Sequence, residues 1–187
     1  MRSLRHLARF PSAIPVTADE ILEFHAARLL LLIRLCGAKP QGGGLPRIDG
    51  LTKMAKLDFF VRYPQFFDQI AARPRKEQST LPNVESSMVR HHYGPWDKRY
   101  YHVLAYLESK RLISVERSGS SFVFSLTAQG QEAAEALSKK GAFDGLVRQM
   151  KAVKKVFGSK TGSKLKKLIY EAFQEEVAEK ELGEVIS

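Results

Sequence analysis

The sequence has 187 residues, and its 30 Lys and Arg outnumber its 20 Asp and Glu to give a formal net charge of +10. Hydrophobic residues at 44% and charged residues at 27% are typical of a globular protein and exclude a disordered or fibrous chain. The single cysteine, Cys36, excludes an internal disulfide and favours a reducing, cytoplasmic setting. No membrane span or signal peptide is expected, because Arg28 and Arg34 interrupt the longest apolar run and residues 1–11 lack a continuous apolar core.

Residues 1–16 are predicted to form an N-terminal arm, because Pro11 and Pro15 stop any helix that begins within it. The arm carries an apolar stripe that is too short to fold alone, and we expect this stripe to bind a partner subunit. Its residues are Leu4, Leu7 and Phe10. The pattern Thr17-Ala-Asp-Glu20 then matches a capping box and predicts a helix that ends near Gly37.

A loop rich in Gly and Pro is expected between Gly37 and Arg47. Its run of three glycines, residues 42–44, lacks the Gly-Lys-Ser/Thr that a phosphate-binding loop needs. An apolar pattern from Leu51 to Tyr63 predicts the second helix. Residues 64–87 begin with a proline and become increasingly polar, so they are predicted to form an inserted loop with at most a short helical turn.

The middle of the chain gives the strongest signal of fold. Met88 to Tyr93 is predicted to be a short strand, and Gly94-Pro95 turns the chain into a third helix that begins at Trp96. Residues 112–117 and 121–126 then alternate in polarity on either side of a glycine turn. This pattern indicates a β-hairpin.

A further helix is predicted after the hairpin, with Thr127 as its cap. The order of helix, helix, helix, hairpin and helix predicts a mainly α fold with a small β-hairpin and a winged helix-turn-helix core over residues 17–140. In this packing, aromatic residues of the third helix are expected to be buried beneath the hairpin and to face its two phenylalanines. They are Trp96 and Tyr100 on the helix, and Phe122 and Phe124 on the hairpin.

Residues 141–187 are predicted to add a C-terminal helical hairpin, because two amphipathic stripes flank the segment from Gly158 to Gly162. Between residues 139 and 167, ten Lys and Arg stand against one acidic residue, Asp144, whereas residues 168–187 carry six Glu and one Lys. The basic block attracts a phosphate or an acidic partner surface, or is the solvated face of a Lys-rich helix. The apolar stripes either pack back on the core or bind a partner.

Two segments carry a resemblance to a known family: GLTKMAKLDFFVRYP at residues 50–64 and MVRHHYGPWDKRYYHVLAYLESKRLI at residues 88–113. With the hairpin after them, they resemble winged-helix proteins that have a TK-x-x-KL helix and a YGP turn. More narrowly, they are similar to the middle components of prokaryotic ABC-three-component defence systems, including Lamassu-type systems. The resemblance covers residues 20–137 and implies an antiviral complex with two partners, an SMC-like ABC ATPase and an effector nuclease.

A winged-helix protein presents its third helix and its wing to DNA, so we expect the cations of these elements to contact it. They are Lys98, Arg99, His102 and Arg117. The basic C-terminal block adds lysines that are expected to contact phosphates without sequence preference. They are Lys151, Lys154, Lys155, Lys164, Lys166 and Lys167. Asp97 and Glu108 dilute the charge of the third helix, which disfavours the reading of a specific base sequence.

No catalytic, metal or cofactor site is expected, and no small-molecule substrate is evident. His91, His92 and His102 have no cysteine or carboxylate beside them at ligand spacing, and no nucleophile–base pair is visible. Two hypotheses of different class remain. The first is a non-enzymatic accessory subunit that bridges an SMC-like ATPase and an effector nuclease and contacts DNA phosphates. The alternative is a stand-alone winged-helix transcriptional regulator that binds an operator as a dimer.

Overall fold

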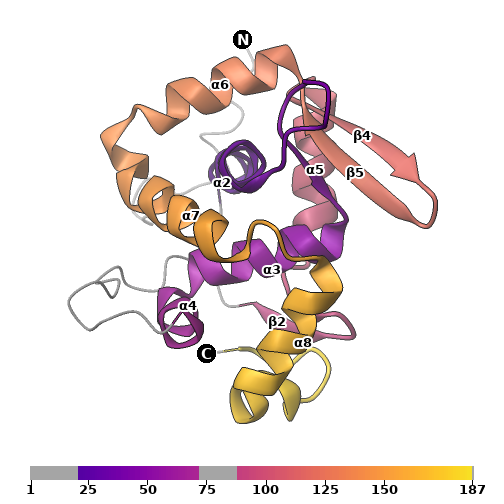
Figure 1. Cartoon of the computed structure of the whole chain (residues 1–187), viewed down its shortest axis with the longest axis vertical. Helices are drawn as coiled ribbons and strands as arrows, with labels where there is room; N and C mark the ends of the chain where they lie inside the picture. Colours follow the sequence, from indigo (N-terminus) through magenta and orange to yellow (C-terminus); the bar gives the residue numbers. More distant parts are fainter. Residues whose placement is uncertain (1–20, 72–87, 187) are drawn as a thin grey trace, which may run out of the picture.

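The computed structural model describes residues 21–71 and 88–186 of the chain (Figure 1). In chain order the elements are α2 (Leu22–Cys36), β1 (Arg47–Asp49), α3 (Leu51–Arg62), α4 (Pro64–Ile70), β2 (Val89–His91), β3 (Gly94–Trp96), α5 (Tyr100–Ser109), β4 (Ile113–Ser118), β5 (Ser121–Leu126), α6 (Ala128–Ser138), the 3₁₀ turn η3 (Gly141–Phe143), α7 (Asp144–Phe157), α8 (Gly162–Ala172) and the π-helical turn η4 (Gln174–Ala178). These residues are mainly helical with a small β-hairpin, as predicted, and the strands form two small antiparallel sheets. The predicted arm and its partner-binding stripe, the capping box and residues 72–87 lie outside the described residues.

Helix α2 lies at the centre of the structure, and Figure 1 looks along its axis. Helices α3, α5, α6 and α7 pack around it. The side chains from Leu29 to Ile33 are at most 1% exposed, because a helix that is apolar on every side has to be covered on every side. The predicted end at Gly37 is confirmed, and its N–H donates to the carbonyl of Ile33 at 3.0 Å. No described helix has the length and apolar character that a bilayer crossing requires.

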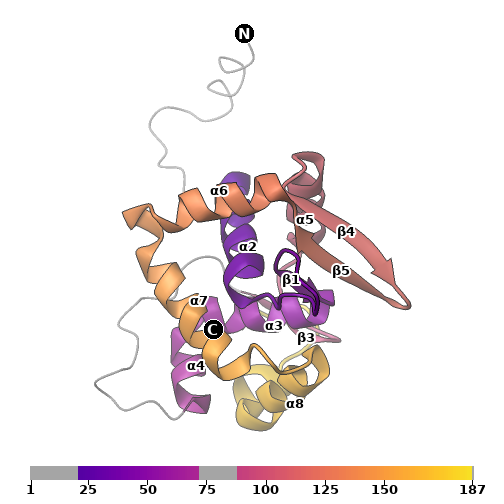
Figure 2. The ribbon, with the colours of Figure 1, turned by 45° about the horizontal axis from the view of Figure 1, so that its top comes forward.

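The predicted hairpin is confirmed as β4 and β5, which pair from Ile113 opposite Leu126 to Ser118 opposite Ser121. It projects from the side of the helices (Figure 2). Strand β1 pairs with the other edge of β5, which gives the strand order β1-β5-β4. The sequence does not predict β1, because a three-residue strand is too short to show an alternating pattern.

The strand expected after Met88 is confirmed as β2, but the chain then turns at Gly94 and returns as β3. Gly94 has a φ of 90°, a conformation that favours glycine. Trp96 was predicted to lie in the third helix, but it is the last residue of strand β3. Helix α5 starts at Tyr100, after a turn in which the N–H of Tyr100 donates to the carbonyl of Asp97 at 3.2 Å.

Trp96 and Tyr100 are buried, but their expected position beneath the β4–β5 hairpin is wrong. The ring of Trp96 stacks on His91 with the centroids 5.1 Å apart, and it meets Tyr100 edge-on at 5.4 Å. The hydroxyl of Tyr100 donates to Asp58 on α3 at 2.8 Å. Phe122, expected to face them, is 47% exposed. The β2–β3 turn causes this difference, because it places Trp96 in a strand.

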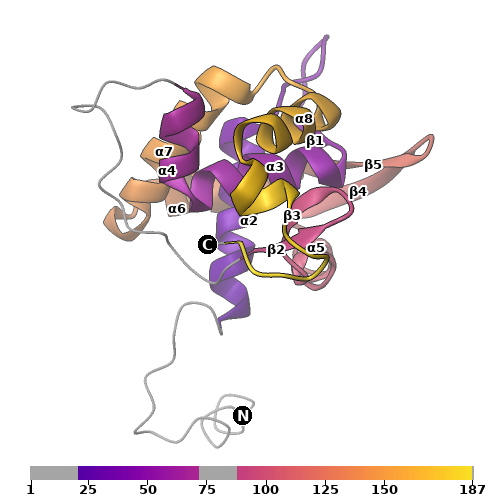
Figure 3. The same cartoon turned by 90° about the horizontal axis from the view of Figure 1, so that it is seen from below.

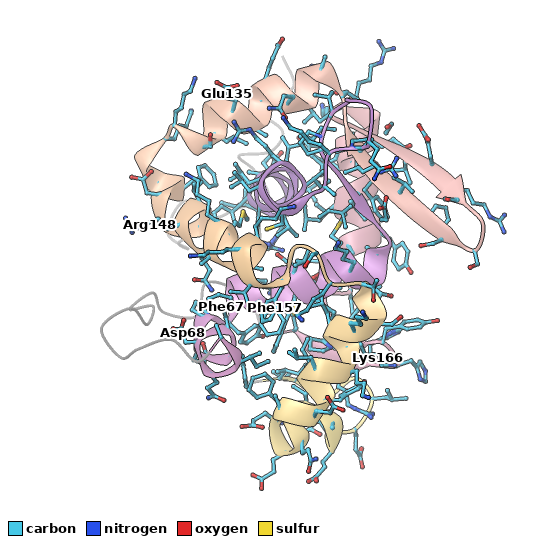
Figure 4. All side chains as sticks on the ribbon, viewed as in Figure 1. Phe67, Asp68, Glu135, Arg148, Phe157 and Lys166 are labelled. Carbon is cyan, nitrogen blue, oxygen red and sulfur yellow. The ribbon has the colours of Figure 1, made fainter. Side chains whose placement is uncertain are left out.

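The short helical turn expected at the beginning of residues 64–87 is confirmed as helix α4 (Pro64–Ile70), whereas residues 72–87 lie outside the described residues. A proline in the first helical turn loses no hydrogen bond, so it begins the helix without cost. Phe66 packs on Phe173 with the ring centroids 4.5 Å apart, and Phe67 packs on Phe157 at 5.6 Å (Figure 4). These partners lie in the C-terminal part of the chain, so no local sequence pattern reveals them.

Helices α7 and α8 pack back on the core, which decides between the two arrangements left open for their apolar stripes. Helix α7 lies against α2 and α3, and α8 lies against α3. Met150, Phe157, Leu165 and Ile169 are at most 1% exposed and belong to the same buried cluster as the apolar residues of α2 and α3. The chain from residue 141 onward therefore shares one core with the residues before it.

The chain beyond η4 runs beside β2 (Figure 3). The N–H of Arg90 donates to the carbonyl of Glu184 at 2.7 Å, and the N–H of Ile186 donates to the carbonyl of Met88 at 2.8 Å. The hydroxyl of Tyr63 also donates to the carbonyl of Ile186, at 3.2 Å. The side chain of Ile186 is fully buried, so the acidic C-terminal segment is held against the rest of the fold.

Candidate nucleic-acid interface

The start of α5, where the sequence predicts DNA contact, is fixed by a buried ion cluster. Asp97 accepts hydrogen bonds from Nη1 of Arg62 at 2.8 Å and from Nε and Nη2 of Arg99 at 2.9 and 2.7 Å. Burial alone would raise the pKa of Asp97. The hydrogen bonds from Arg99 and the charges of Arg62 and Arg99 outweigh that effect and hold the pKa well below its usual range. Asp97 therefore stays ionised and keeps both arginines in place.

Asp58 on α3 forms the second half of this cluster. It accepts from Nε of Arg28 at 3.0 Å and from the hydroxyl of Tyr100 at 2.8 Å. Nη2 of Arg28 lies 3.9 Å from Asp97, which joins the two halves. Because these groups come from α2, α3 and the start of α5, the cluster sets the position of α5. Removing one member of such a buried network is strongly destabilising.

Arg99, expected to contact DNA, belongs to the ion cluster. Besides its bonds to Asp97, its Nη1 lies 2.8 Å from Nε2 of the buried His25. Its side chain is 31% exposed. Arg99 therefore positions the helix and is not presented outward, whereas Lys98 and His102 are exposed as expected.

The surface between α5 and the β4–β5 hairpin is an apolar groove of about 200 Å³. It is lined by Leu51, Tyr101, Leu104, Ala105, Glu108, Val115, Phe122 and Phe124. Tyr101 is 67% exposed, and Glu108 is the one charged residue of the lining. Arg117 is exposed near the tip of the hairpin, where its Nε donates to the carbonyl of Gly119 at 3.1 Å. The groove suits a protein surface better than a row of phosphates.

The predicted lysines of α7 divide into two kinds. Lys151 and Lys155 are exposed, as a phosphate-binding surface requires. Nζ of Lys154 instead donates to the carbonyls of Cys36 and Gly37 at 3.1 and 2.6 Å, where it caps the carboxyl end of α2. Arg148, also on α7, points outward (Figure 4). Lys154 is therefore a structural residue, and the exposed cations of α7 lie on its outer face.

The predicted lysines of α8 border a cavity between this helix and the start of α3. Lys166 and Lys167 line the cavity, and Lys164 is exposed one turn before Lys167. Nζ of Lys167 lies 3.6 Å from Glu171, and Nζ of Lys166 donates to the carbonyl of His92 at 2.7 Å. The structure thus brings Lys166 and Lys167 together on one wall but leaves the lysines of α7 on another helix.

Two further lysines, both on α3, are not among the predicted site residues. Lys53 lines the same cavity, and its position in the first helical turn, where the macrodipole disfavours a cation, is the signal that could have found it. Lys56 is fully buried, and its Nζ donates to the carbonyl of Pro95 at 2.7 Å. Burial and the charge of Lys166 lower the pKa of Lys56 to about 7. Lys56 thus ties α3 to the β2–β3 hairpin.

No catalytic constellation emerges from these groups. Within residues 21–71 and 88–186, no three His, Cys, Asp or Glu side chains gather as a metal site would need. The thiol of Cys36 donates to the carbonyl of Met150 at 3.3 Å, and burial raises its pKa to about 12. A buried thiol of this kind is inert and fills space in the core.

Comparison with protein-family models, with curated protein sequences and with solved structures gives no match to this chain. Inference about its function therefore depends on its own residues.

Proposed function

We propose that this protein is a non-enzymatic winged-helix accessory subunit of a prokaryotic antiviral complex. It bridges an SMC-like ABC ATPase and an effector nuclease, and it contacts the phosphates of DNA without reading a base sequence. The observation that carries the winged-helix assignment is the order α2, β1, α3, α5, β4, β5 with the sheet order β1-β5-β4. In this arrangement α5 takes the place of the recognition helix, and β4 with β5 takes that of the wing.

The assignment of partners is supported by the resemblance of residues 50–64 and 88–113 to the middle components of ABC-three-component systems. The apolar groove between α5 and the hairpin also supports the assignment of partners, because it offers a surface to which a second protein can bind. Exposed aromatic residues such as Tyr101 and Phe122 are enriched at the centres of protein interfaces, where they contribute much of the binding energy. We assign this groove to a partner subunit.

Contact with DNA phosphates is supported by the exposed lysines of the C-terminal helices. Lys151 and Lys155 on α7 and Lys164 on α8 are exposed, in a segment where basic residues outnumber acidic ones. Exposed lysines on long flexible stems bind phosphates through charge and require no fixed geometry. Such contacts position a protein on DNA without selecting a sequence.

Co-purification tests this proposal. The tagged chain is co-expressed with an SMC-like ATPase and a nuclease from neighbouring genes, and it is expected to retain both. Phe122→Asp is expected to lose at least one of them, because a charge replaces an exposed ring in the apolar groove. Val156→Asp is the matched control, since Val156 is 38% exposed on α7 and outside the groove. Equal retention by the wild-type chain and Phe122→Asp, or no partner with the wild-type chain, contradicts the proposal.

The second candidate function is a stand-alone transcriptional regulator. The observation that favours it is the exposure of Lys98, His102 and Arg117 on α5 and the hairpin, where a winged-helix regulator reads DNA. A regulator binds one operator sequence selectively and loses that selectivity when Lys98 and His102 are replaced by alanine. Selection of a binding sequence from random duplex DNA separates this candidate from the accessory subunit, for which no sequence is enriched.

A further inference from the structure

The cavity between α3 and α8 has a volume of about 800 Å³ and is not used by the proposed function. Small-molecule sites in proteins have volumes of about 300–1,000 Å³. Its walls come from four parts of the fold: the start of α3, one side of α8, the β2–β3 turn at Tyr93, and the β1 and β5 ends at Asp49 and Ser121. The cavity is therefore built by the folded core and not by a single loop.

The charged residues in the lining of this cavity are three lysines and two carboxylates. The lysines are Lys53, Lys166 and Lys167, and Nζ of Lys53 donates one hydrogen bond to the carbonyl of Gly158 at 3.0 Å. The acidic residues of the lining are Asp49 and Glu171, and each has a cation beside it: Nε of Arg47 lies 3.1 Å from Asp49, and Nζ of Lys167 lies 3.6 Å from Glu171. The lining itself has one lysine more than it has carboxylates, and Arg47 beside it adds a further cation, so the charge favours an anion.

The amino end of α3 contributes to the same wall. The first N–H groups of a helix have no partner within it, and the macrodipole makes this end favourable for an anion. Gly50 is the N-cap and has no side chain with which to accept these N–H groups. Gly162 of α8 packs closely against the same turn. A Cβ at this position would lie 2.8 Å from the backbone nitrogen of Lys53, so only glycine fits here. Hydroxyl groups complete the lining, on Thr52, Ser121 and Ser163.

A flat aromatic face lies next to these cations. Tyr93 is 53% exposed at the β2–β3 turn. Nζ of Lys166 lies 5.7 Å from the ring of Tyr93 and 5.3 Å from the ring of Tyr170, between two aromatic residues of the lining. Figure 4 places Lys166 on the side of α8 that faces the β2–β3 hairpin. An exposed tyrosine held beside a cation is the arrangement on which nucleic-acid bases stack.

We propose that this cavity binds a nucleotide, with its phosphate at the start of α3 among the lysines and its base on Tyr93. An inorganic anion would contact the lysines but would not stack on the tyrosine. An uncharged ring would stack on the tyrosine but would not pair with the lysines. A ligand that combines a phosphate with a planar ring uses both. A free nucleotide and the phosphorylated end of a nucleic-acid strand share this chemistry. The site is separate from the α5 groove and from the lysines of α7. It shares helix α8 with Lys164, which the proposed function assigns to DNA phosphates, but Lys164 is not part of the cavity lining.

Binding of AMP to the full-length chain tests the proposal. Calorimetry gives the affinity, and the fluorescence of Trp96 reports on the site, because Trp96 is the one tryptophan of the chain and its ring centroid lies 6.4 Å from that of Tyr93. We expect saturable binding of AMP, with adenosine and inorganic phosphate each weaker by about tenfold or more. A short single strand is then compared with and without a 5′-phosphate. Tighter binding of the phosphorylated strand than of AMP assigns the site to strand ends, and the reverse assigns it to free nucleotides.

Variants with matched controls locate the binding. Lys167→Ala is expected to weaken AMP and inorganic phosphate alike, whereas Tyr93→Ala is expected to weaken AMP and leave inorganic phosphate unchanged. The controls are Lys155→Ala and Tyr101→Ala, an exposed lysine and an exposed tyrosine outside the cavity. Absence of saturable AMP binding overturns the proposal. It is also overturned if inorganic phosphate binds as tightly as AMP, or if the cavity variants behave as their controls do.

Discussion

The apolar groove between α5 and the hairpin and the basic cavity between α3 and α8 differ in chemistry but share two short stretches of backbone. At the start of α3, Leu51 lines the groove while Thr52 lines the cavity. At the start of β5, Phe122 lines the groove while Ser121 lines the cavity. Successive residues of strand β5 point to opposite faces, and successive residues of helix α3 point about 100° apart, so in both elements one residue of offset separates an apolar surface from a basic one. Two different ligands can thus be bound on opposite sides of one junction.

The two surfaces also depend on different supports. The groove needs α5, which is held by the ion cluster around Asp97 and Asp58. The cavity needs the packing of α8 on α3 and the β2–β3 hairpin, which Lys56 ties to α3 through its bond to the carbonyl of Pro95. A substitution in the ion cluster should therefore perturb the groove more than the cavity, and a substitution at Lys56 should perturb the cavity more than the groove.

Removal of Asp97 has the largest expected effect. Asp97→Ala removes the acceptor of Arg62 and Arg99 from a buried network, and such losses cost about 3–5 kcal/mol. Urea unfolding measures this loss of stability, and hydrogen exchange should show that amides of α5 lose more protection than those of α8. Asp144→Ala, at an exposed carboxylate in the first turn of α7, is the control. Equal loss of protection in α5 and α8 would mean that the two surfaces share one support.

The next effect in size is the pH dependence that Lys56 confers. Its pKa is about 7 in the folded protein, whereas an unfolded lysine keeps its proton up to about pH 10.5. Between these values the unfolded state binds more protons, so the free energy of unfolding rises with pH by up to about 1.4 kcal/mol per unit. Lys56→Met should remove this rise between about pH 7 and 9.5, as measured by urea unfolding.

The control for this pH experiment is Lys151→Met, which replaces an exposed lysine of α7. Other groups also titrate, since burial lowers the pKa of Lys53 and of His91. The difference between the wild-type chain and Lys56→Met cancels their contributions. If the two proteins show the same pH dependence while Lys151→Met also matches them, Lys56 does not carry the effect.

The smallest expected effect is on the salt dependence of DNA binding. If Lys151 and Lys155 contact phosphates, log affinity for duplex DNA falls with log salt by about 0.9 for each phosphate neutralised. Replacing both with glutamate should flatten this slope by about 2 and leave the stability of the fold nearly unchanged. Fluorescence anisotropy on the free chain and on the assembled complex measures it. The same change at Lys98 and His102 should matter less, and the opposite ranking would move DNA contact to the α5 surface.

The sequence predicts those elements whose cause is local. The hairpin follows from alternation on both sides of Gly119. Helix α6 begins at Ala128, directly after its N-cap Thr127, whose hydroxyl accepts from the N–H of Gly130. Strand β1 is too short for any periodicity. Helix α4 contains Phe66 and Phe67, whose partners on α7 and after α8 are about a hundred residues away. Only the folded chain reveals such contacts.

The candidate sites divide in the same way. The exposure of Lys151 and Lys155 follows from their place opposite an apolar stripe, which the sequence displays. Lys154 lies beside them in the sequence, but it bonds to carbonyls at residues 36 and 37, and no pattern predicts that. Arg99 was expected to face DNA as a cation of the third helix, and Asp97 was interpreted as a charge that weakens the positive surface of that helix and not as the partner of Arg99. Because Asp97 is buried, it binds the side chain of Arg99 and holds it in the ion cluster.

The pairing of residues 183–186 with β2 has a consequence for how the chain reaches its fold. One side of β2 pairs with β3, and the other is closed by backbone hydrogen bonds from the segment around Glu184 and Ile186. This contact spans almost a hundred residues, and contacts of such long range are slow to form because a long loop has to close first. Until then β2 is an open strand edge, which can pair with a second chain. Docking of this segment therefore covers a strand edge that a second chain could otherwise pair with.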